Sequence, residues 1–330
     1  MVTEVSAINA ESLQKAKEIL TGGGLVGMPT ETVYGLAADA RSAQAVQEVF
    51  RVKGRPQDNP LIVHVHENFD LSTLVEISQD YVYALLRAFT PGPITLVLKS
   101  KNVVAPQVSC GLDSLAVRIP SHAGAQAFLS YVNMPIAAPS ANLSKHTSPV
   151  TAAHVLQDFS GKIPLILDGG RCSGGIESTV INVMGEVPVI LRSGLITKED
   201  VIRVVGKCEY AAENAPIRSP GMKYRHYHPL CETAMFPLNE LSKATALAAS
   251  ARKEGKRVLY LASEEAQTAL FALGEKSVLS LGKTEEEIAR NVYYLLHEAE
   301  EKCDLLIAIA MEERGALVGV MNRLKKACAP

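Results

Sequence analysis

ITLVLKSKNVVAPQVSCGLDSLAVRIPSHAGAQAFLSYVNMPIAAPS, residues 94–140, decides the fold class of this chain. It contains three short apolar runs, ITLVLK (94–99), LAVRIP (115–120) and PIAAPS (135–140), whose length and composition indicate buried strands. A helical stretch at 122–132 separates the last two runs. Strands that alternate with helices predict an α/β domain built on a sheet.

The alternation of predicted strands and helices continues on both sides of this stretch. Asn9 and Ser42 are candidate N-caps for helices over 10–21 and 43–52. Some neighbouring strands are separated by too few residues for a helical crossover, so we expect an open, twisted sheet of mixed direction. Further predicted strands are LVGMP (25–29), LIVHV (61–65), PLILD (164–168), TVINV (179–183) and PVILR (188–192), with helices near 80–89 and 151–159.

The periodicity predicts two domains. Residues 1–205 form the larger one, which ends with a helix that begins near Thr197. Residues 206–229 have weak periodicity and several basic side chains, and we interpret them as a linker. Residues 230–330 restart the pattern with TAMFPL, RVLYLA and LLIAIAM and with helices at 240–254 and 284–301. The sequence therefore predicts a second, smaller, Rossmann-like α/β domain.

Composition excludes several classes of protein. The chain has 330 residues, is 47% hydrophobic and carries a formal charge of −2, so no overall positive field attracts it to nucleic acid or to an anionic membrane. No apolar run approaches the roughly 20 residues that span a bilayer, and the first residues do not resemble a signal peptide, so we expect a cytoplasmic protein. Its six cysteines lack a C-x-x-C pair, which favours reduced, packed thiols. His226, His228 and Cys231 lack a regularly spaced fourth metal ligand.

Two familiar nucleotide-binding patterns do not apply. Gly22, Gly24 and Gly27 match G-x-G-x-x-G, but a helix precedes them and a strand follows, which is the reverse of the order that a dinucleotide site needs. The chain contains no G-x-x-x-x-G-K-[ST] loop. Any use of a nucleotide must therefore depend on other motifs.

PTETVYG (29–35) and KGRP (53–56) are two such motifs. Thr30, Thr32 and Tyr34 follow a strand and can line a small-ligand pocket, although a plain turn would look similar. Lys53 and Arg55 can bind a polyphosphate, the first as a point charge and the second as a bidentate fork. On these residues alone, surface cations at a helix C-terminus are the better interpretation, and we expect both to be partly exposed.

Other polar groups recur at strand ends. APSANLS (138–144) ends a strand with small hydroxyl and amide groups, where open α/β sheets bind ligands, although Asx and Ser turns are common alternatives. The glycine-rich DGGRCSGGIESTVINV (168–183) lets backbone amides approach an anion. Arg118 and Arg192 end two apolar strands, where each is either solvated or paired with a carboxylate or phosphate. His64, inside an apolar strand, is more often a core histidine than a catalyst.

Taken together, PTETVYG, K-x-R-P with NPLIVHV, PGPITLVL, GLDSLAVRIP, APSANLS and GGIESTVINV strongly resemble the YrdC-like, threonylcarbamoyl-AMP synthase family. The resemblance covers residues 8 to about 205. GMKYRHYHP (221–229) and the α/β unit after it resemble the long, two-domain form of that family. The fold that this implies is a YrdC-like open twisted mixed sheet followed by a smaller Rossmann-like domain.

The resemblance implies a nucleotidyltransferase that makes L-threonylcarbamoyladenylate and pyrophosphate from L-threonine, bicarbonate and ATP. Lys53 and Arg55 would be catalytic. A Mg²⁺ ion would bridge the ATP phosphates without a dedicated protein cage, with Ser140 as the candidate side chain near it. The implied ATP-binding residues are Lys53, Arg55, Asn59, Ser114, Ala138, Ser140, Asn142, Ser148, Arg192 and Tyr227.

For the amino acid, the resemblance implies that Arg118 binds the carboxylate. Tyr227 resembles the family's lid tyrosine, which would shield a labile product from water. The chain departs from the family pattern at HYHP (226–229), where HYAP is expected, and at RSG (192–194), where RPG is usual. The implied threonine-binding residues are Thr30, Thr32, Tyr34, His64, Arg118 and Ser178.

The implied partners are a downstream threonylcarbamoyl transferase complex and, through it, the tRNA whose adenosine beside the anticodon is modified. No membrane is involved. Two alternatives remain at this point. One is a non-catalytic RNA-binding or ribosome-associated factor, which the near-neutral charge disfavours. The other is carbamoyl transfer, which needs additional zinc-finger and acylphosphatase segments that this sequence lacks.

Overall fold

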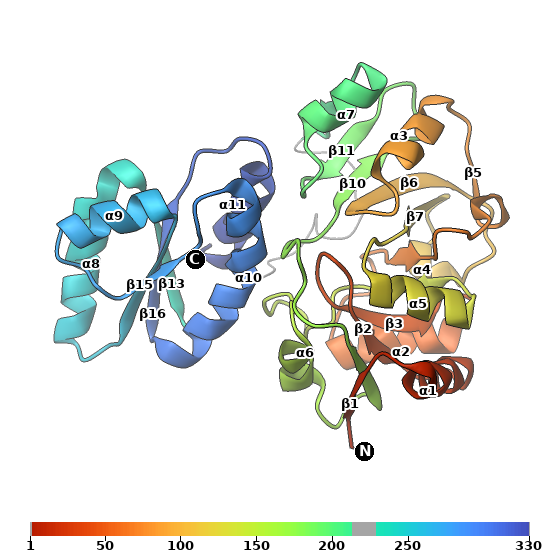
Figure 1. Cartoon of the computed structure of the whole chain (residues 1–330), viewed down its shortest axis with the longest axis horizontal. Coiled ribbons are helices and arrows are strands. Elements are labelled where there is room, and N and C mark those ends of the chain that lie inside the picture. The colour runs from red at the N-terminus through yellow and green to blue at the C-terminus, as the bar shows by residue number, and fades with distance from the viewer. Residues whose placement is uncertain (1, 213–228, 330) are drawn as a thin grey trace. The chain divides into compact units, whose positions relative to one another are not determined.

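The computed structural model describes residues 2–212 and 229–329. The chain divides into two compact units (Figure 1). The larger comprises Met1–Ser144 and Ser148–Tyr224, and the smaller comprises Lys145–Thr147 and Arg225–Pro330. Within the described residues, no helix is both long enough and apolar enough to cross a membrane.

The larger unit is built on one sheet of mixed direction, as the sequence predicts. Strands β4 and β7 run parallel, whereas β6 is antiparallel to β7 and β2 is antiparallel to β3. β5 (Val75–Glu76) pairs with β6 outside the main order. The main order is β1 (Glu4–Ala7), β9 (Leu165–Asp168), β2 (Val26–Met28), β3 (Gly35–Asp39), β8 (Ile136–Ala137), β4 (Ile62–His64), β7 (Ser114–Arg118), β6 (Ile94–Ser100), β10 (Thr179–Asn182), β11 (Val189–Arg192) and β12 (Glu209–Tyr210).

The helices of this unit begin where local capping chemistry allows. Asn9 accepts a hydrogen bond from the Ser12 amide and Ser42 accepts one from the Ala45 amide, so both predicted N-caps are confirmed. The last helix begins after Thr197, which forms a capping box with Asp200. The helices are α1 (Ala10–Thr21), α2 (Ala43–Lys53), α3 (Tyr81–Phe89), α4 (Pro106–Ser109), α5 (Ala123–Val132), α6 (Ala152–Phe159) and α7 (Lys198–Val205), with a 3₁₀ turn at Leu71–Thr73.

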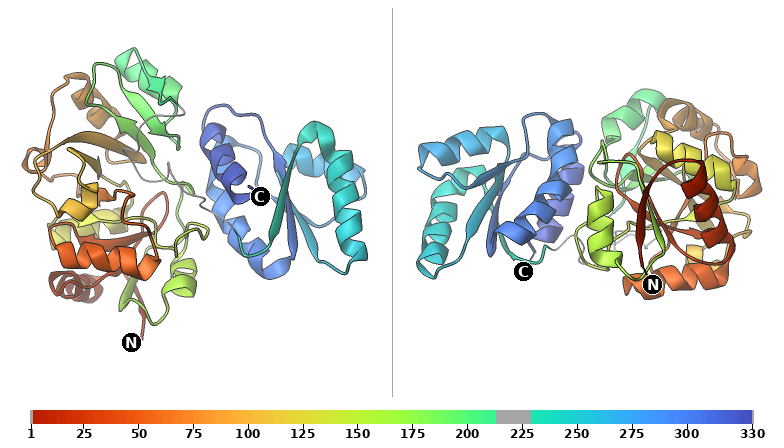
Figure 2. Two further views of the ribbon diagram at one scale, coloured as in Figure 1. Left: turned by 180° about the vertical axis from the view of Figure 1, so that it is seen from behind. Right: turned by 60° about the horizontal axis from the view of Figure 1, so that its bottom comes forward.

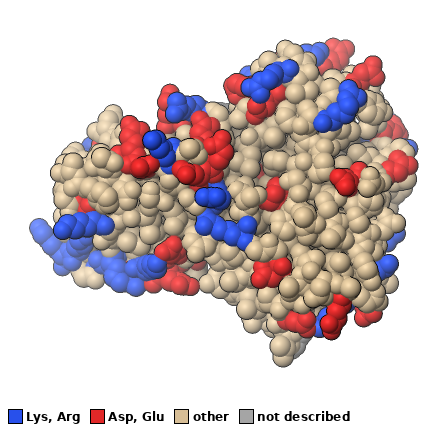
Figure 3. All heavy atoms as spheres, viewed as in Figure 1, with Lys and Arg blue, Asp and Glu red and all other residues tan. Residues whose placement is uncertain are grey.

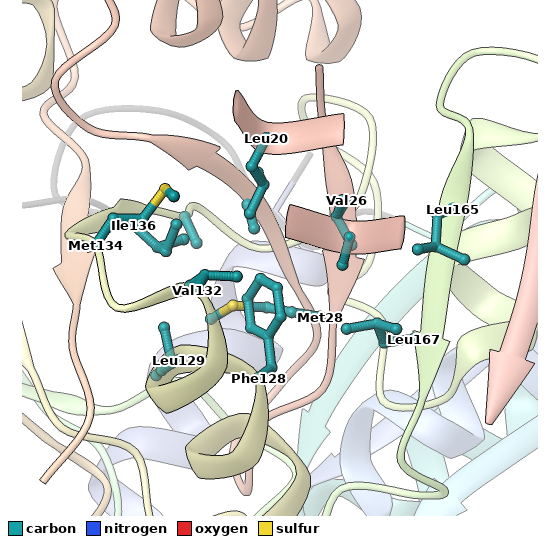
Figure 4. Packing of buried hydrophobic residues seen from close by; sticks show 13 residues of the cluster. Leu20, Val26, Met28, Phe128, Leu129, Val132, Met134, Ile136, Leu165 and Leu167 are labelled. Carbon is teal, nitrogen blue, oxygen red and sulfur yellow. The ribbon is translucent and has the colours of Figure 1, made fainter. Parts of the chain in front are cut away.

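A tightly packed core fixes one part of the sheet. Leu20 of α1 and Phe128 of α5 pack with Met28 of β2, Ile136 of β8 and Leu165 of β9, and all five are fully buried (Figure 4). Burying a side chain of this size stabilises the fold by about 1.5–3 kcal/mol. These contacts join segments that are distant in sequence, and they hold the strands on which the polar motifs lie.

The smaller unit is a parallel sheet with helices on both faces, which confirms the predicted Rossmann-like architecture (Figures 1 and 2). Three predicted strands and two predicted helices are present, whereas α9, β15 and α11 were not predicted. The sheet order is β13 (Glu232–Pro237), β16 (Leu305–Ala310), β14 (Val258–Ala262) and β15 (Val278–Ser280), and the helices are α8 (Leu241–Lys253), α9 (Glu264–Ala272), α10 (Glu285–Lys302) and α11 (Leu317–Ala327), with a 3₁₀ turn at Leu238–Glu240.

A hollow of about 1080 Å³ lies at the carboxyl ends of these four strands. Its lining includes Asn239, Ser263, Gly282 and Arg314, each of which follows a different strand. Two of the helix starts at this edge, those of α10 and α11, already have a carboxylate partner from the chain itself. The Ala316 amide at the start of α11 donates to a carboxylate oxygen of Glu285 (2.9 Å), and Glu287 accepts from the Lys283 and Thr284 amides at the start of α10 (2.8 and 3.1 Å).

Candidate active site

Polar residues of neighbouring strands share one face of the large sheet. His64 of β4 is paired with Arg118 of β7, and Ala116 is paired with Val97 of β6. Paired residues face the same side, and so do residues two apart along a strand. Ser114, Arg118 and His64 therefore lie on the same face.

Arg192 of β11 lies on the same face, which continues from β6 across β10 to β11. Val180 of β10 is paired both with Thr95 of β6 and with Arg192 of β11. Thr95 is two residues from Val97, so it faces the same side as Arg118. The Arg192 guanidinium donates to the Ser178 carbonyl (2.9 and 3.1 Å) and hydroxyl (3.1 Å), and that hydroxyl lies 2.7 Å from Thr95 Oγ1.

Ala138 and Ser140 continue this face along the edge of the sheet. Ile136 of β8 is paired with His64, and alternation places Ala138 and Ser140 on the same side. The Ala138 amide donates to the Ile62 carbonyl (3.0 Å), and Ser140 forms an isolated bridge with Gly35. Farther along the loop, the Ser148 hydroxyl donates to a carboxylate oxygen of Glu177 at 2.6 Å.

Lys53 is buried, so the expectation that it is partly exposed is wrong. Only 2% of its surface is accessible, because its ammonium donates to the main-chain carbonyls of Ser140 (2.5 Å) and Asn142. The Ser144 amide donates to the Lys53 carbonyl (2.8 Å). Burial, and secondarily the charge of Arg55, lowers the Lys53 pKa well below its usual value. Lys53 thus holds the APSANLS loop in place.

Arg55, as expected, is half-buried. Its guanidinium donates to the carbonyls of Asn59 (3.2 Å) and Pro60 (3.3 Å). The side-chain amide of Asn59 has neither its nitrogen nor its oxygen hydrogen-bonded within the described residues, although both atoms are buried. Buried amides are normally satisfied, so this one is suited to a ligand.

The loop between β2 and β3 carries the two predicted threonines. Thr30 Oγ1 lies 2.9 Å from Thr32 Oγ1 and donates to the Val33 carbonyl at 2.6 Å. Tyr34 is engaged elsewhere, because its hydroxyl donates to the Gly170 carbonyl (2.8 Å) and accepts from the Gly169 amide (3.1 Å). Its hydroxyl therefore braces the start of the glycine-rich segment.

The structure adds a residue that the motif analysis passed over. Glu31, between the two threonines, lies with a carboxylate oxygen 2.8 Å from Arg118 Nη2. His64, next to Arg118, donates from Nδ1 to the Ile62 carbonyl, and burial, with a contribution from Arg118, lowers its pKa to about 3. Glu31 is the one acidic residue of PTETVYG, so its charge was a signal that the sequence offered.

One predicted nucleotide contact, Tyr227, lies outside the described residues, as do His226 and His228. The described part of the chain holds no group of three or more His, Cys, Asp or Glu side chains placed to bind a metal ion.

Comparisons with known proteins match both units. A family model described as "Telomere recombination" covers residues 18–194, and one described as "Threonylcarbamoyl-AMP synthase, C-terminal domain" covers residues 196–329. The chain is 41% identical to the threonylcarbamoyl-AMP synthase of Pyrococcus abyssi, over 92% of this chain and 90% of the relative. It is 37% identical to that of Bacillus subtilis, over 99% and 95%.

Among solved structures, the chain resembles the crystal structure of Sua5 from P. abyssi in complex with L-threonine. The TM-score is 0.89 at 38% identity, and the match covers 99% of this chain and 97% of the other. Because both the sequence and the fold match over nearly their full length, this chain belongs to the threonylcarbamoyl-AMP synthase family, in its long, two-domain form.

Proposed function

We propose that this protein makes threonylcarbamoyl-AMP and pyrophosphate from ATP, L-threonine and bicarbonate. The observation that supports this best is the convergence of Arg118, Arg192 and Ser178 on one sheet face, beside the edge held by Lys53 and Ser140. Relatives that match nearly the whole chain bear the name of this synthase, and one relative was crystallised with L-threonine.

The reaction concentrates negative charge, which this face is suited to bear. Threonine and bicarbonate form an N-carboxylate with loss of water, and an oxygen of that carboxylate attacks the α-phosphorus of ATP as pyrophosphate leaves. Preorganised cations and donors lower the energy of such a transition state more than water does. We assign the phosphate oxygens to Arg55 and Arg192, and we assign Lys53 to holding the loop that carries Ser140 and Asn142.

The remaining polar groups divide between the two substrates. The proposed nucleotide site also includes Asn59, Ser114, Ala138, Ser148 and Tyr227, the last of which lies outside the described residues. The proposed threonine site consists of Thr30, Thr32, His64, Ser178 and Arg118. Within it Arg118 binds the carboxylate, and Tyr34 supports the wall of the site. His64 is neutral at physiological pH because of its lowered pKa, so it contributes polarity rather than charge.

We propose that Mg²⁺ accompanies ATP. Mg²⁺ keeps several waters and is often held through substrate phosphates with few protein ligands, so it does not need an acidic cage from the chain. Ser140 is the candidate protein group near it. The ion would neutralise phosphate charge, whereas the protein residues orient the substrates.

The product is a reactive mixed anhydride, so we propose a partner that consumes it. A threonylcarbamoyl transferase complex would transfer the group to the adenosine beside the tRNA anticodon, and this protein would meet tRNA only indirectly, in the cytoplasm. Figure 3 shows basic and acidic side chains interspersed on the viewed face. Together with the net charge of −2, this gives no support to the alternative of a dedicated RNA-binding protein.

A coupled pyrophosphate assay tests this proposal. Purified protein with Mg-ATP should release pyrophosphate only when L-threonine and bicarbonate are both present, and mass spectrometry should detect threonylcarbamoyl-AMP. Omitting either substrate is the control. Equal pyrophosphate release without threonine or without bicarbonate would contradict the assignment, because the attacking N-carboxylate requires both.

A further inference from the structure

The ion pair between Glu31 and Arg118 is buried but incomplete. Glu31 is 7% exposed and Arg118 is 4% exposed, with 2.8 Å between Oε1 and Nη2. Despite this closeness, neither carboxylate oxygen of Glu31 and neither Nε nor Nη2 of Arg118 makes a well-directed hydrogen bond within the described residues. A buried pair is favourable only when its remaining donors and acceptors are satisfied. Groups left this way are suited to partners that arrive with a ligand.

Two titratable neighbours of this pair, His64 and Cys172, carry no charge at neutral pH. Burial, with a contribution from Arg118, lowers the His64 pKa to about 3, so the ring stays neutral. Burial raises the pKa of the Cys172 thiol to about 12, and the charges of Glu31 and Arg118 also act on it. This part of the site therefore offers one full negative and one full positive charge side by side.

The main chain around Glu31 is fixed, so its side chain is the part that can respond to a ligand. The Gly174 amide donates to the Glu31 carbonyl at 2.7 Å. Thr30 Oγ1 accepts from the Thr32 amide (3.1 Å) and donates to the Val33 carbonyl (2.6 Å), which closes the turn around Glu31. A preorganised turn costs little further ordering when substrate binds.

We infer that Glu31 binds the α-ammonium group of the amino-acid substrate while Arg118 binds its carboxylate, so that this pair selects a zwitterion. The inference rests on the proposed function for the identity of that amino acid. In an α-amino acid the nitrogen and the carboxyl carbon are about 2.5 Å apart. A zwitterion that enters between Glu31 and Arg118 exchanges one ion pair for two, and no charge is left without a partner.

The same geometry rejects molecules that carry only one of the two charges. A carboxylic acid without an amine would pair with Arg118 and leave the Glu31 carboxylate buried and unpaired. An amine without a carboxylate would leave Arg118 in the same state. Because an unpaired buried charge is strongly unfavourable, the pair makes Glu31 a determinant of specificity.

Equilibrium binding of two ligands tests this role. L-threonine and (R)-3-hydroxybutanoate, which is threonine without its amino group, are titrated into the wild type and into Glu31→Gln. The wild type should bind threonine at least about 100-fold more tightly than the hydroxy acid, because a site built for a polar group rejects an analogue that lacks it. In Glu31→Gln this ratio should fall to within about 5-fold, because glutamine cannot neutralise the ammonium group.

A matched variant separates this role from a structural one. Glu275 also pairs with an arginine, Arg252, at 2.7 Å, and lies in the smaller unit. Glu275→Gln should leave the binding ratio unchanged. Glu31→Asp keeps the negative charge and replaces Glu31→Gln in the experiment if Glu31→Gln does not fold. Glu31→Asp should retain part of the preference for threonine over the hydroxy acid. ATP binding reports on folding in every variant.

The outcomes are distinguishable from those of the proposed function. If Glu31→Gln keeps the wild-type ratio, or if both ligands weaken by the same factor, Glu31 only neutralises Arg118 and the inference is wrong. If the wild type discriminates through Glu31 but releases no pyrophosphate with threonine and bicarbonate, the inference stands and the proposed reaction fails.

Discussion

Lys53 shows at the scale of one residue how a charged side chain can act through the main chain. Its ammonium is fixed to the carbonyls of Ser140 and Asn142, 87 and 89 positions away in sequence. A lysine in solvent would act on phosphate as a mobile point charge. This one instead determines where a strand-end loop lies, so its removal should disturb both the loop and the ATP that we place there.

Lys53→Met keeps the length of the side chain but removes its charge and its donors. We expect pyrophosphate release at about 25 °C to fall by at least about 100-fold and the melting temperature to fall by about 5–15 °C, because each of the two lost hydrogen bonds costs about 1–3 kcal/mol and losing a buried charge offsets part of that. Lys101 is the matched control, since its ammonium donates to the Ser72 carbonyl in an exposed turn. Lys101→Met should match the wild type in both measurements, and wild-type activity in Lys53→Met would contradict the assigned role.

Residue-level prediction from sequence succeeded where the chemistry was local. The motifs predicted that Arg118 and Arg192 end two apolar strands, and the registers place both on one face of the sheet. The burial of Lys53 was missed because it depends on a loop that approaches from far along the chain. The pairing of Glu31 with Arg118 was missed for the same reason, since 86 residues separate two segments that only the folded sheet brings together.

Helices and strands, like single residues, were predicted correctly where their conformation depends on nearby residues and missed where it depends on distant ones. Helices with strong caps, such as the one after Ser42, were predicted within a residue or two, because capping depends on the next three residues. Strand β3 was not predicted, since GLAAD has no β-branched residue and owes its conformation to pairing with β2 and β8. Strand β15 of the smaller unit was also not predicted, and its conformation likewise depends on pairing, here with β14.

The connection after β11 supports a prediction at the scale of an element. Gly194 lies against the segment that begins β10, and a Cβ on it would lie 2.4 Å from the Thr179 amide nitrogen and 2.6 Å from the Glu177 carbonyl. Gly194→Ala must therefore displace the segment that holds Ser178. We expect kcat/KM for threonine to fall by about tenfold or more, with unchanged circular dichroism.

The control for this prediction is a glycine with free space around it. A Cβ on Gly185, between β10 and β11, would meet only the Val187 carbonyl at 3.9 Å. Gly185→Ala should keep wild-type kcat/KM. If both variants behave alike, the close approach of Gly194 has no influence on the site.

At the scale of the whole molecule, two α/β units of different architecture share one chain, and we expect only the larger to bind nucleotide. Isothermal titration with Mg-ATP should give one site per chain. Lys53→Met should weaken that site, whereas Glu285→Gln should not. A second site of similar affinity in the wild type would contradict this, because it would have to lie in the smaller unit.

We expect the smaller unit not to bind nucleotide because the carboxylate of Glu285, from α10, lies at the start of α11. In nucleotide-binding proteins of similar architecture, the exposed amides of a helix start attract a phosphate group. Here a glutamate from a neighbouring helix already neutralises the partial positive charge of that helix end. The start of α11 in the smaller unit is therefore occupied by a carboxylate of the chain itself, and a phosphate group would have to displace Glu285 before it could bind there.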